Sequence, residues 1–234
     1  PFSGSGTVLV EGQKLGLDVI GLDINPLAIL LTQVQLEGVP ANEIDTHNAD
    51  LFFFFLMLNG NVKPLCFTNV KKWFTDEVIA SLSVIRQAIM SENDDRIRRF
   101  YWCCFAETVK KYSNTRTSTF KLHIKDEKHI AAQIDDSIDF FKDHVKTQSK
   151  RYSRVRTDLS KHYLDCGDSK DILRRMPSNS VDLICTSPPY GDNHTTVTYG
   201  QYSILPLLWM DPNDIDLWNP EMLETFTAID SLSL

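Results

Sequence analysis

The chain has 234 residues, of which 42% are hydrophobic and 24% charged, as is typical of a soluble globular protein with one sizeable core. Its formal net charge of −7 excludes a wholly basic nucleic-acid coat. The longest apolar run, at 51–58, is too short to span a bilayer, and no secretory signal opens the sequence, so we expect no membrane association. The 5 cysteines lack a zinc spacing, which predicts no metal site and reduced thiols in a cytoplasmic protein.

The first segment, residues 1–40, is predicted to alternate between helix and strand. A glycine-rich turn precedes a helical stretch at 7–15, and "LDVIGLDI" at 17–24 is typical of a short apolar strand that ends in an acid. The pair Asn25-Pro26 predicts the start of a second, strongly apolar helix, because proline suits the first helical turn. We expect this second helix to pack on a sheet.

The turn "PFSGSGT" has the composition of a backbone that binds a ligand. Gly4 and Gly6 allow a tight turn and the close approach of a ligand, and the start of the following helix presents backbone N–H groups. Asp23, at the end of the next strand, can accept hydrogen bonds from both hydroxyls of a ribose. These residues predict a site for a nucleoside-containing cofactor. A dinucleotide site would need a third glycine, where this sequence has Leu9, and a plain tight turn is the structural alternative.

The central segment, residues 41–160, is predicted to form an inserted, mostly helical subdomain. Apolar residues recur at helical spacing in three stretches, the first capped by Thr75 and the third beginning at Ile134. A polar loop lies at 113–119, and a stretch at 142–161 carries seven basic against two acidic residues, a charge of +5. Such a stretch either follows a phosphate backbone or forms a solvated basic helix.

The last segment, residues 161–234, returns to an alternating pattern. A strand is expected at 162–168, a short helix at 169–176 and, after a turn, a fully apolar strand at 181–186. The order strand, helix, strand predicts a parallel sheet with right-handed crossovers. We expect Cys185, within the last strand, to be a buried core residue and not a nucleophile.

The motif "SPPY" follows that strand directly, where open α/β sheets bind ligands. Pro188 and Pro189 donate no N–H and stiffen the loop, which leaves carbonyl oxygens, the Ser187 hydroxyl and one aromatic ring for a ligand. Such a loop can accept hydrogen bonds from a planar amino group while Tyr190 stacks on the attached ring, as a receptor for an extruded nucleobase would. The structural alternative is a Pro-Pro turn with a surface tyrosine.

Together the stretches "PFSGSGT…GLDINPLA" and "SVDLICTSPPYGD" resemble the amino-methylating DNA methyltransferases, the family of N4-cytosine and N6-adenine enzymes of the SPPY type. The resemblance covers residues 1–30 and 163–210. It implies an α/β fold, with a Rossmann-like sheet that binds S-adenosylmethionine and an inserted helical subdomain, and methyl transfer to an exocyclic amino group of DNA. The serine form resembles the cytosine-N4 branch more than the adenine-N6 branch, where aspartate or asparagine is usual. Adenine-N6 methylation stays open as the alternative.

The resemblance also implies roles for individual residues. The catalytic residues that it implies are Ser187, Pro188, Pro189 and Tyr190. The cofactor-binding residues that it implies are Phe2, Gly4, Ser5, Gly6, Thr7, Asp23, Ile24 and Asp168. Asp168 resembles the acidic position that contacts the adenine amino group of the cofactor, and Asp50 is a rival for that role. In one arrangement of the family the insert reads the DNA sequence, which gives as candidate DNA contacts Arg116, Arg151, Arg154 and Arg156.

The order of the motifs predicts three segments, which are a cofactor-binding part at 1–40, a helical DNA-recognition insert at 41–160 and a catalytic part at 161–234. No strand precedes the glycine turn and none is obvious after "SPPY", so we expect an incomplete sheet, in part of a larger enzyme or in a chain completed by a partner. The expected partners are DNA, a cognate restriction endonuclease and a chain that supplies the rest of the sheet. A non-catalytic nucleic-acid-binding subunit that keeps the fold is the alternative from another class.

Overall fold

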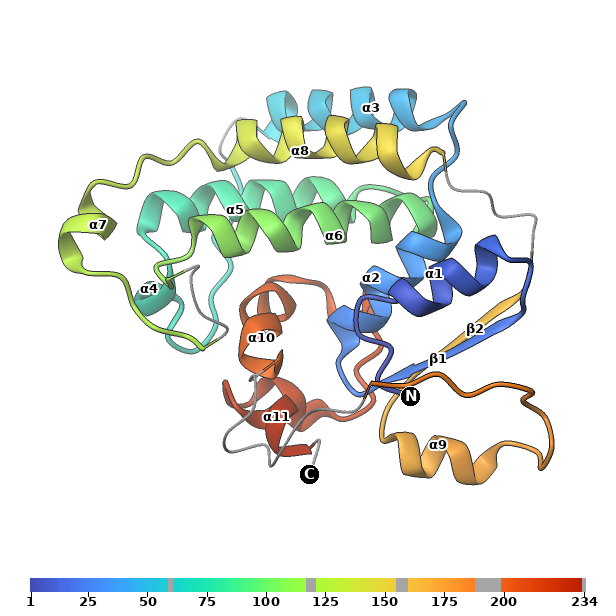
Figure 1. Ribbon diagram of the computed structural model, residues 1–234. Coiled ribbons are helices and arrows are strands. Elements are labelled where there is room, and N and C mark those ends of the chain that lie inside the picture. The colour runs from blue at the N-terminus through green and yellow to red at the C-terminus, as the bar shows by residue number, and fades with distance from the viewer. Residues whose placement is uncertain (59–60, 117–120, 155–159, 188–198, 233–234) are drawn as a thin grey trace. The chain divides into compact units, whose positions relative to one another are not determined.

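The computed structural model describes residues 1–58, 61–116, 121–154, 160–187 and 199–232 (Figure 1). The chain forms two compact units. The α/β unit comprises Pro1–Gly38, Val155–Ile204 and Pro212–Leu234, and the helical unit comprises Val39–Arg154 and Leu205–Asp211. The helical unit therefore combines the central part of the sequence with a short segment from near its C-terminus.

The α/β unit is built on two parallel strands, β1 (Val19–Asp23) and β2 (His162–Cys166). Their register places Asp23 opposite Cys166, so both strands end at the same edge. Around them are α1 (Thr7–Lys14), α2 (Pro26–Glu37), α9 (Ser169–Arg175), the first part of α10 (Tyr199–Trp209), the short η1 (Pro212–Asp214) and η2 (Pro220–Leu223), and α11 (Ala228–Leu232). Helices α1, α2 and α9 contact the strands (Figure 1), which gives the mixed α/β arrangement that the sequence predicts.

Local sequence explains why α2 begins where it does. Asn25 precedes the helix, and its side chain accepts a hydrogen bond from Leu27 N at 3.1 Å. Pro26 occupies the first helical position, where its missing N–H is not needed. The helix is buried over most of its length, as its apolar composition indicates. The prediction of a helix after this pair of residues is confirmed.

The helical unit contains four long helices that contact one another, α3 (Ile44–Leu58), α5 (Asp76–Met90), α6 (Asp95–Tyr112) and α8 (Ser137–Tyr152), together with the short α4 (Val70–Trp73) and α7 (Glu127–Ala131). The predicted cap of α5 is confirmed, because the hydroxyl of Thr75 accepts from Val78 N at 3.4 Å. In the core of the unit, the ring of Phe105 contacts the rings of Trp102, Phe141 and Trp209. This cluster of fully buried aromatic side chains supplies much of the apolar burial of the unit.

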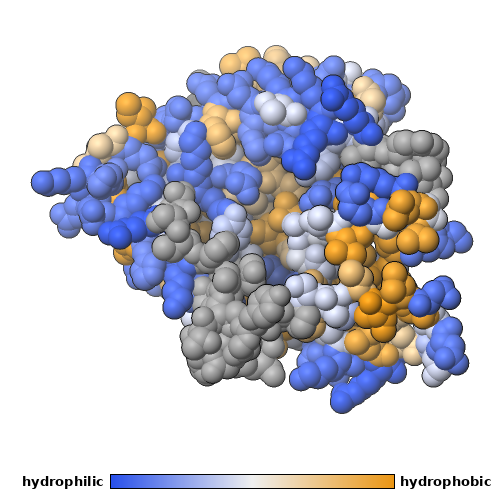
Figure 2. Space-filling view, viewed as in Figure 1, coloured by the Kyte–Doolittle hydropathy of each residue, from blue (hydrophilic) through white to orange (hydrophobic). Residues whose placement is uncertain are grey.

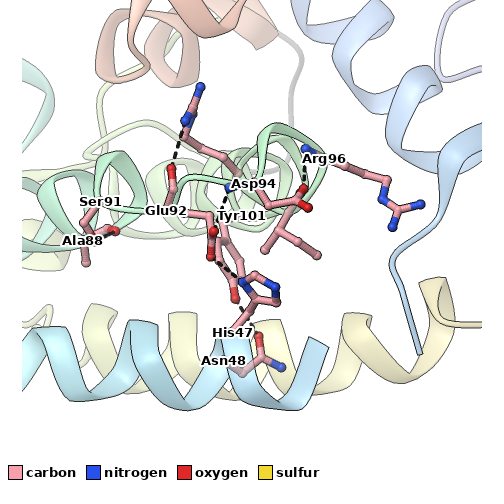
Figure 3. A network of polar contacts seen from close by, with 10 residues as sticks. His47, Asn48, Ala88, Ser91, Glu92, Asp94, Arg96 and Tyr101 are labelled. Carbon is pink, nitrogen blue, oxygen red and sulfur yellow. Dashed lines mark hydrogen bonds and ion pairs between the residues drawn. The ribbon is translucent and has the colours of Figure 1, made fainter. Parts of the chain in front are cut away.

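Polar side chains between these helices are paired with one another (Figure 3). His47 on α3 contacts the carboxylate of Glu92 at 2.9 Å. The hydroxyl of Tyr101 on α6 donates to the amide oxygen of Asn48 at 3.1 Å, and burial raises the pKa of this tyrosine far above its ordinary value. Glu92 also accepts from the backbone N–H of Asp94 at 2.9 Å, directly before α6. The network satisfies buried polar groups, so we assign it a structural role.

The predicted strand at 181–186 is wrong. These residues have no helix or strand assignment, and Leu183 and Ile184 are 76% and 69% exposed. Cys185 is likewise exposed, which contradicts its prediction as a core residue. The physical reason is that β1 pairs with β2, and no described strand lies beside 181–186 to complete a ladder and cover its side chains. Figure 2 shows apolar side chains gathered on the surface of this region of the α/β unit.

Two apolar stretches of the helical unit are also less buried than their composition suggests. The run at 51–58 is part of α3 and exposes Phe53, Leu56 and Met57 on its outer face. Ile134, which the sequence places at the beginning of the third amphipathic helix, lies before α8 and is 82% exposed. The structure describes no helix that is both long and apolar enough to cross a membrane.

Candidate functional site

The glycine turn lies at the end of β1 and is held by the backbone. Ser3 N donates to Leu22 O at 3.0 Å, and Gly6 N donates to Ser3 O at 2.9 Å. Phe2, Gly4 and Gly6 all have positive φ, of 58°, 55° and 81°. Glycine adopts this conformation without strain, which is why the turn needs glycine at two of these positions. The turn leads directly into the first residue of α1.

Asp23 joins this turn to the end of the strand. Its carboxylate accepts from Gly4 N at 2.7 Å and from Asn25 N at 2.9 Å. Burial raises the pKa of the Asp23 carboxyl above its ordinary value of 3.8, although the backbone hydrogen bonds act in the opposite direction. Because a carboxylate has about four lone-pair sites, these two bonds leave it able to accept from ribose hydroxyls.

The turn also has two features of a cradle for a ligand. The hydroxyl of Ser3 is buried and has no hydrogen-bond partner among the described residues, although buried polar groups are normally paired. Gly4 faces open space, since a Cβ built on it would meet no atom within 4 Å. A Cβ on Gly6, in contrast, would lie 2.6 Å from Thr32 Cγ2. The residues therefore fit the nucleoside cofactor that the sequence predicts, with one face of the turn open and the other packed.

The missing third glycine is explained by a glycine on the strand. Leu9, which stands at that position on α1, is buried, and its side chain approaches Gly21 of β1. A Cβ on Gly21 would lie 2.4 Å from Leu9 Cδ1 and 2.7 Å from Leu164 Cδ2. The close contact between helix and strand is thus made with the glycine on the strand, and the sequence comparison with the dinucleotide pattern does not reveal it.

The end of β2 lies beside the end of β1. Gly167 N donates to Asp23 O at 2.9 Å. Asp168 caps α9, because its side chain accepts from Lys170 N at 2.7 Å. The rival candidate Asp50 is an exposed residue on α3, in the helical unit. Within the α/β unit, Asp168 is therefore the acidic candidate that lies next to the strand ends.

The segment before "SPPY" contacts the residues of the glycine turn. The hydroxyl of Thr186 donates to Pro1 O at 2.9 Å, and the next residue, Ser187, is exposed. The other three residues of the motif, Pro188, Pro189 and Tyr190, lie outside the described residues. The contact at Thr186 brings the beginning of the motif to the same edge of the α/β unit as Gly4 and Asp23.

The chain after the motif is anchored by an aspartate near the C-terminus. Asp230 on α11 accepts from Gly200 N at 2.8 Å and from Gln201 N at 3.2 Å, in the first turn of α10. Burial raises the pKa of this carboxyl. A Cβ on Gly200 would lie 2.9 Å from Asp230 N, so the glycine permits this close approach. The start of α10 therefore has a fixed position within the unit.

The candidate DNA contacts fall at two ends of the helical unit. Arg116 follows the antiparallel bridge between Thr115 and Ile124 and pairs with Asp126 at 3.2 Å. Next to this bridge, Lys125 Nζ donates to Gln133 Oε1, just before α8, at 2.9 Å. Arg151 and Arg154 are exposed and lie at the other end of α8. A helix of 16 residues is about 24 Å long, so this length separates the two ends. Arg156 lies outside the described residues.

Two residues of this edge were missed by the sequence prediction. Ser3 lies within the glycine turn, and its position between Phe2 and Gly4 was the available signal. Trp218 comes from the irregular C-terminal region, and its indole N–H donates to Ile24 O at 3.0 Å. No local pattern indicates that a tryptophan so far along the chain lies next to Ile24.

Comparison with known proteins gives one informative relative. No family model matches the sequence, and no solved structure matches it significantly. The chain is similar to the Type II methyltransferase M.MvaI of Kocuria varians, with 32% identity over 226 residues. The match covers 90% of this chain and 50% of the relative, so the chain spans half the length of the curated protein that it matches.

Proposed function

The chain belongs to the DNA methyltransferase family, and we propose that it forms the part of a site-specific enzyme that transfers a methyl group from S-adenosylmethionine to the N4 amino group of cytosine in DNA. One observation carries this proposal. The glycine turn, Asp23 and the residue that precedes "SPPY" meet at one edge of the α/β unit. A cofactor on the turn and an amine at Ser187 would then share one site.

The cofactor is held by the turn and by the strand ends. Gly4, Ser5, Gly6 and Thr7 surround it with backbone, and the free hydroxyl of Ser3 adds one further hydrogen bond. Asp23 accepts hydrogen bonds from the ribose hydroxyls. Remaining contacts come from Phe2, Ile24 and Asp168. S-adenosylmethionine, when bound, supplies an electrophilic methyl group on a sulfonium ion.

The target amine is activated by orientation and hydrogen bonding. The exocyclic nitrogen of cytosine is a poor nucleophile, because its lone pair is delocalised into the ring. Ser187 Oγ and the carbonyl of Pro188 accept its hydrogens and favour a tetrahedral nitrogen, while Tyr190 stacks on the base. With the cofactor held by the glycine turn and Asp23, its sulfonium would supply the methyl group to this nitrogen, and the methylated nitrogen would lose one proton to solvent. No covalent bond to the protein is required.

The experiment that tests this proposal identifies the methylated nucleoside. The chain is incubated with mixed-sequence DNA and S-adenosylmethionine that carries a labelled methyl group, and the DNA is digested to nucleosides. We expect the label in N4-methylcytosine, whereas label in N6-methyladenine would replace the cytosine assignment by the adenine alternative. Labelled DNA should be lost in Ser187→Ala and kept in Ser178→Ala, a matched change of an exposed serine.

A second measurement is needed to interpret an assay in which no methylated nucleoside is found. Because the chain spans half of its relative, methyl transfer can require residues that this chain does not contain. A calorimetric titration with S-adenosylmethionine therefore accompanies the assay. Absence of both binding and methylation would contradict the enzyme proposal and support a non-catalytic nucleic-acid-binding subunit.

The DNA partner is proposed to contact the basic end of α8. Replacing Arg151 and Arg154 by alanine should weaken binding to DNA and reduce the slope of log K against log salt by about 0.9 for each phosphate that the variant no longer neutralises. Arg174→Ala, which changes an exposed arginine on α9, is the control. Unchanged binding by the double variant at both low and high salt would remove these residues from the interface.

A strand from another chain or segment is the proposed cover for residues 181–186. Their exposed apolar side chains, together with those of Ile20 and Tyr163 on the strands, support this part of the proposal. A cognate restriction endonuclease is proposed as a functional partner of such an enzyme and not as this cover.

A further inference from the structure

Trp218 occupies the point where the two strands end. Its indole Nε1–H donates to Ile24 O, directly after β1, at 3.0 Å. A Cβ built on Gly167, directly after β2, would lie 4.0 Å from Trp218 Cγ. Gly167 in turn donates its backbone N–H to Asp23 O. The indole therefore lies at both strand ends, and its hydrogen bond goes to the residue that follows Asp23, whose carboxylate is proposed to bind a ribose.

Trp218 differs in exposure from the other three tryptophans of the protein. Trp218 is 36% exposed, whereas Trp73, Trp102 and Trp209 are all buried in the helical unit. A tryptophan combines a large apolar ring with one N–H donor, so that it can be anchored by a hydrogen bond at its edge while part of its ring stays open to solvent. The hydrogen bond to Ile24 fixes the edge of this ring, so that its exposed surface has a defined orientation. A fixed ring that is partly open to solvent is suited to stacking on a planar ligand.

We propose that Trp218 is the stacking platform for the purine ring of the nucleoside cofactor, an inference that rests on the proposed function. The two groups at the strand ends are suited to different parts of a nucleoside. Asp23 offers a carboxylate for the hydroxyls of the sugar, and the indole offers a π-face for the base. Asp168, one residue beyond Gly167, lies where it can meet the edge of the base. The platform also explains why a residue of the irregular C-terminal region is tied to the end of β1.

The first experiment measures access to this ring. Tryptophan fluorescence of the whole chain is quenched with acrylamide, which reaches exposed indoles and therefore reports mainly on Trp218. We expect S-adenosylhomocysteine to protect the fluorescence from acrylamide, adenosine to do the same, and methionine to have no effect. The readout is specific because the three other tryptophans are buried.

The second experiment compares variants by calorimetric titration with S-adenosylhomocysteine. Trp218→Leu, which removes the aromatic face, should bind about tenfold more weakly, and Trp218→Phe should keep most of the affinity. Leu173→Ala, which changes another exposed apolar side chain of the same unit, is the matched control and should bind like the wild type. Circular dichroism verifies that each variant is folded.

The outcomes separate this inference from the proposed function. If the wild-type chain binds the ligand, but Trp218→Leu binds equally well and acrylamide access does not change, the platform is wrong and the proposed function stands. If the wild-type chain binds neither S-adenosylhomocysteine nor S-adenosylmethionine, the proposed function fails and the platform fails with it. If Trp218→Leu does not fold, protection of the wild-type fluorescence by adenosine decides the question.

Discussion

The two units bury their large apolar side chains to different degrees. In the helical unit, Trp102, Phe105 and Phe141 are completely buried. In the α/β unit, Leu183 and Ile184 lie on the surface, although they form one of the most apolar stretches of the sequence. The difference indicates that the helical unit is stabilised by its own core, whereas the α/β unit leaves apolar surface for a ligand or another strand. The helical unit also exposes apolar side chains, such as Phe53 and Leu56 on α3, but the exposed stretch at 181–186 lies in the unit that carries the candidate site.

The largest expected effect is the loss of an aromatic ring from the helical core. Phe105→Ala should lower the free energy of unfolding by about 3–5 kcal/mol, because it removes buried contacts and leaves a cavity. Urea denaturation followed by the helical circular dichroism signal measures this. Leu183→Ala is the matched change in the α/β unit and should cost less than about 0.5 kcal/mol. Equal losses for the two variants would show that the contrast between the units does not exist.

The next effect concerns the carboxylate at the end of β1. Asp23→Asn removes a charged acceptor for ribose hydroxyls and should weaken binding of S-adenosylhomocysteine by about 10- to 100-fold. Calorimetric titration measures the change. Asp182→Asn, at an exposed position of the same unit, is the control. If Asp23→Asn binds as the wild type does, the carboxylate only holds the glycine turn.

The pH dependence of ligand binding gives a second test of the role of the Asp23 carboxylate. Burial raises the Asp23 pKa above 3.8, so the group takes up a proton at a higher pH than an ordinary aspartate does. As pH falls through the raised pKa, the carboxylate is lost and the affinity for the ligand should fall. The free energy of unfolding depends on pH in the opposite direction to the affinity. The contribution of Asp23 to this free energy is fully present below pH 3.8 and is lost as pH rises through the raised pKa. Titrations down to about pH 4 test this, and Asp23→Asn should lack the dependence.

A smaller effect is expected at the anchor of α10. Asp230→Asn weakens the bonds to Gly200 N and Gln201 N and should cost about 0.5–2 kcal/mol, the usual range for a helix cap. Hydrogen exchange of these two amides should become faster, which locates the effect at the start of the helix. Glu224→Gln changes an exposed acid of the same region and should leave the exchange unaltered.

The smallest perturbation is chemical labelling of the thiols. Iodoacetamide should modify Cys66 and Cys185, which are exposed, and spare the three buried cysteines, Cys103, Cys104 and Cys166. Burial raises the pKa of each of these three thiols, so that they stay protonated near neutral pH. Mass spectrometry of peptides measures the modification. Protection of Cys185 would show that 181–186 is covered, as its sequence predicted.

Local sequence predicted most helices and strands, because the interactions that define their ends are made between neighbouring residues. Asn25 and Thr75 cap helices with their own side chains, so a few neighbouring residues are sufficient to place these starts. The glycine turn could also be predicted, because positive φ limits the choice of residue. Asp23 was identified as the end of a strand from its position alone, and its hydrogen bond to Gly4 N agrees with a role beside the turn.

Other features could not be read from neighbouring residues. The burial of 181–186 depends on whether a second strand lies beside it, which its apolar composition does not reveal. Gly21, on β1, provides the close contact that a third glycine on the helix would otherwise allow. The sequence could not predict this, because the contact depends on how α1 and β1 pack against each other. Short-range preferences and motifs were sufficient to predict helices such as α2 and α5, the turn and the family resemblance, but not the helices α3 and α10. The place of Trp218 at the end of β1 became known from the folded chain alone, because that contact joins residues separated by 194 positions.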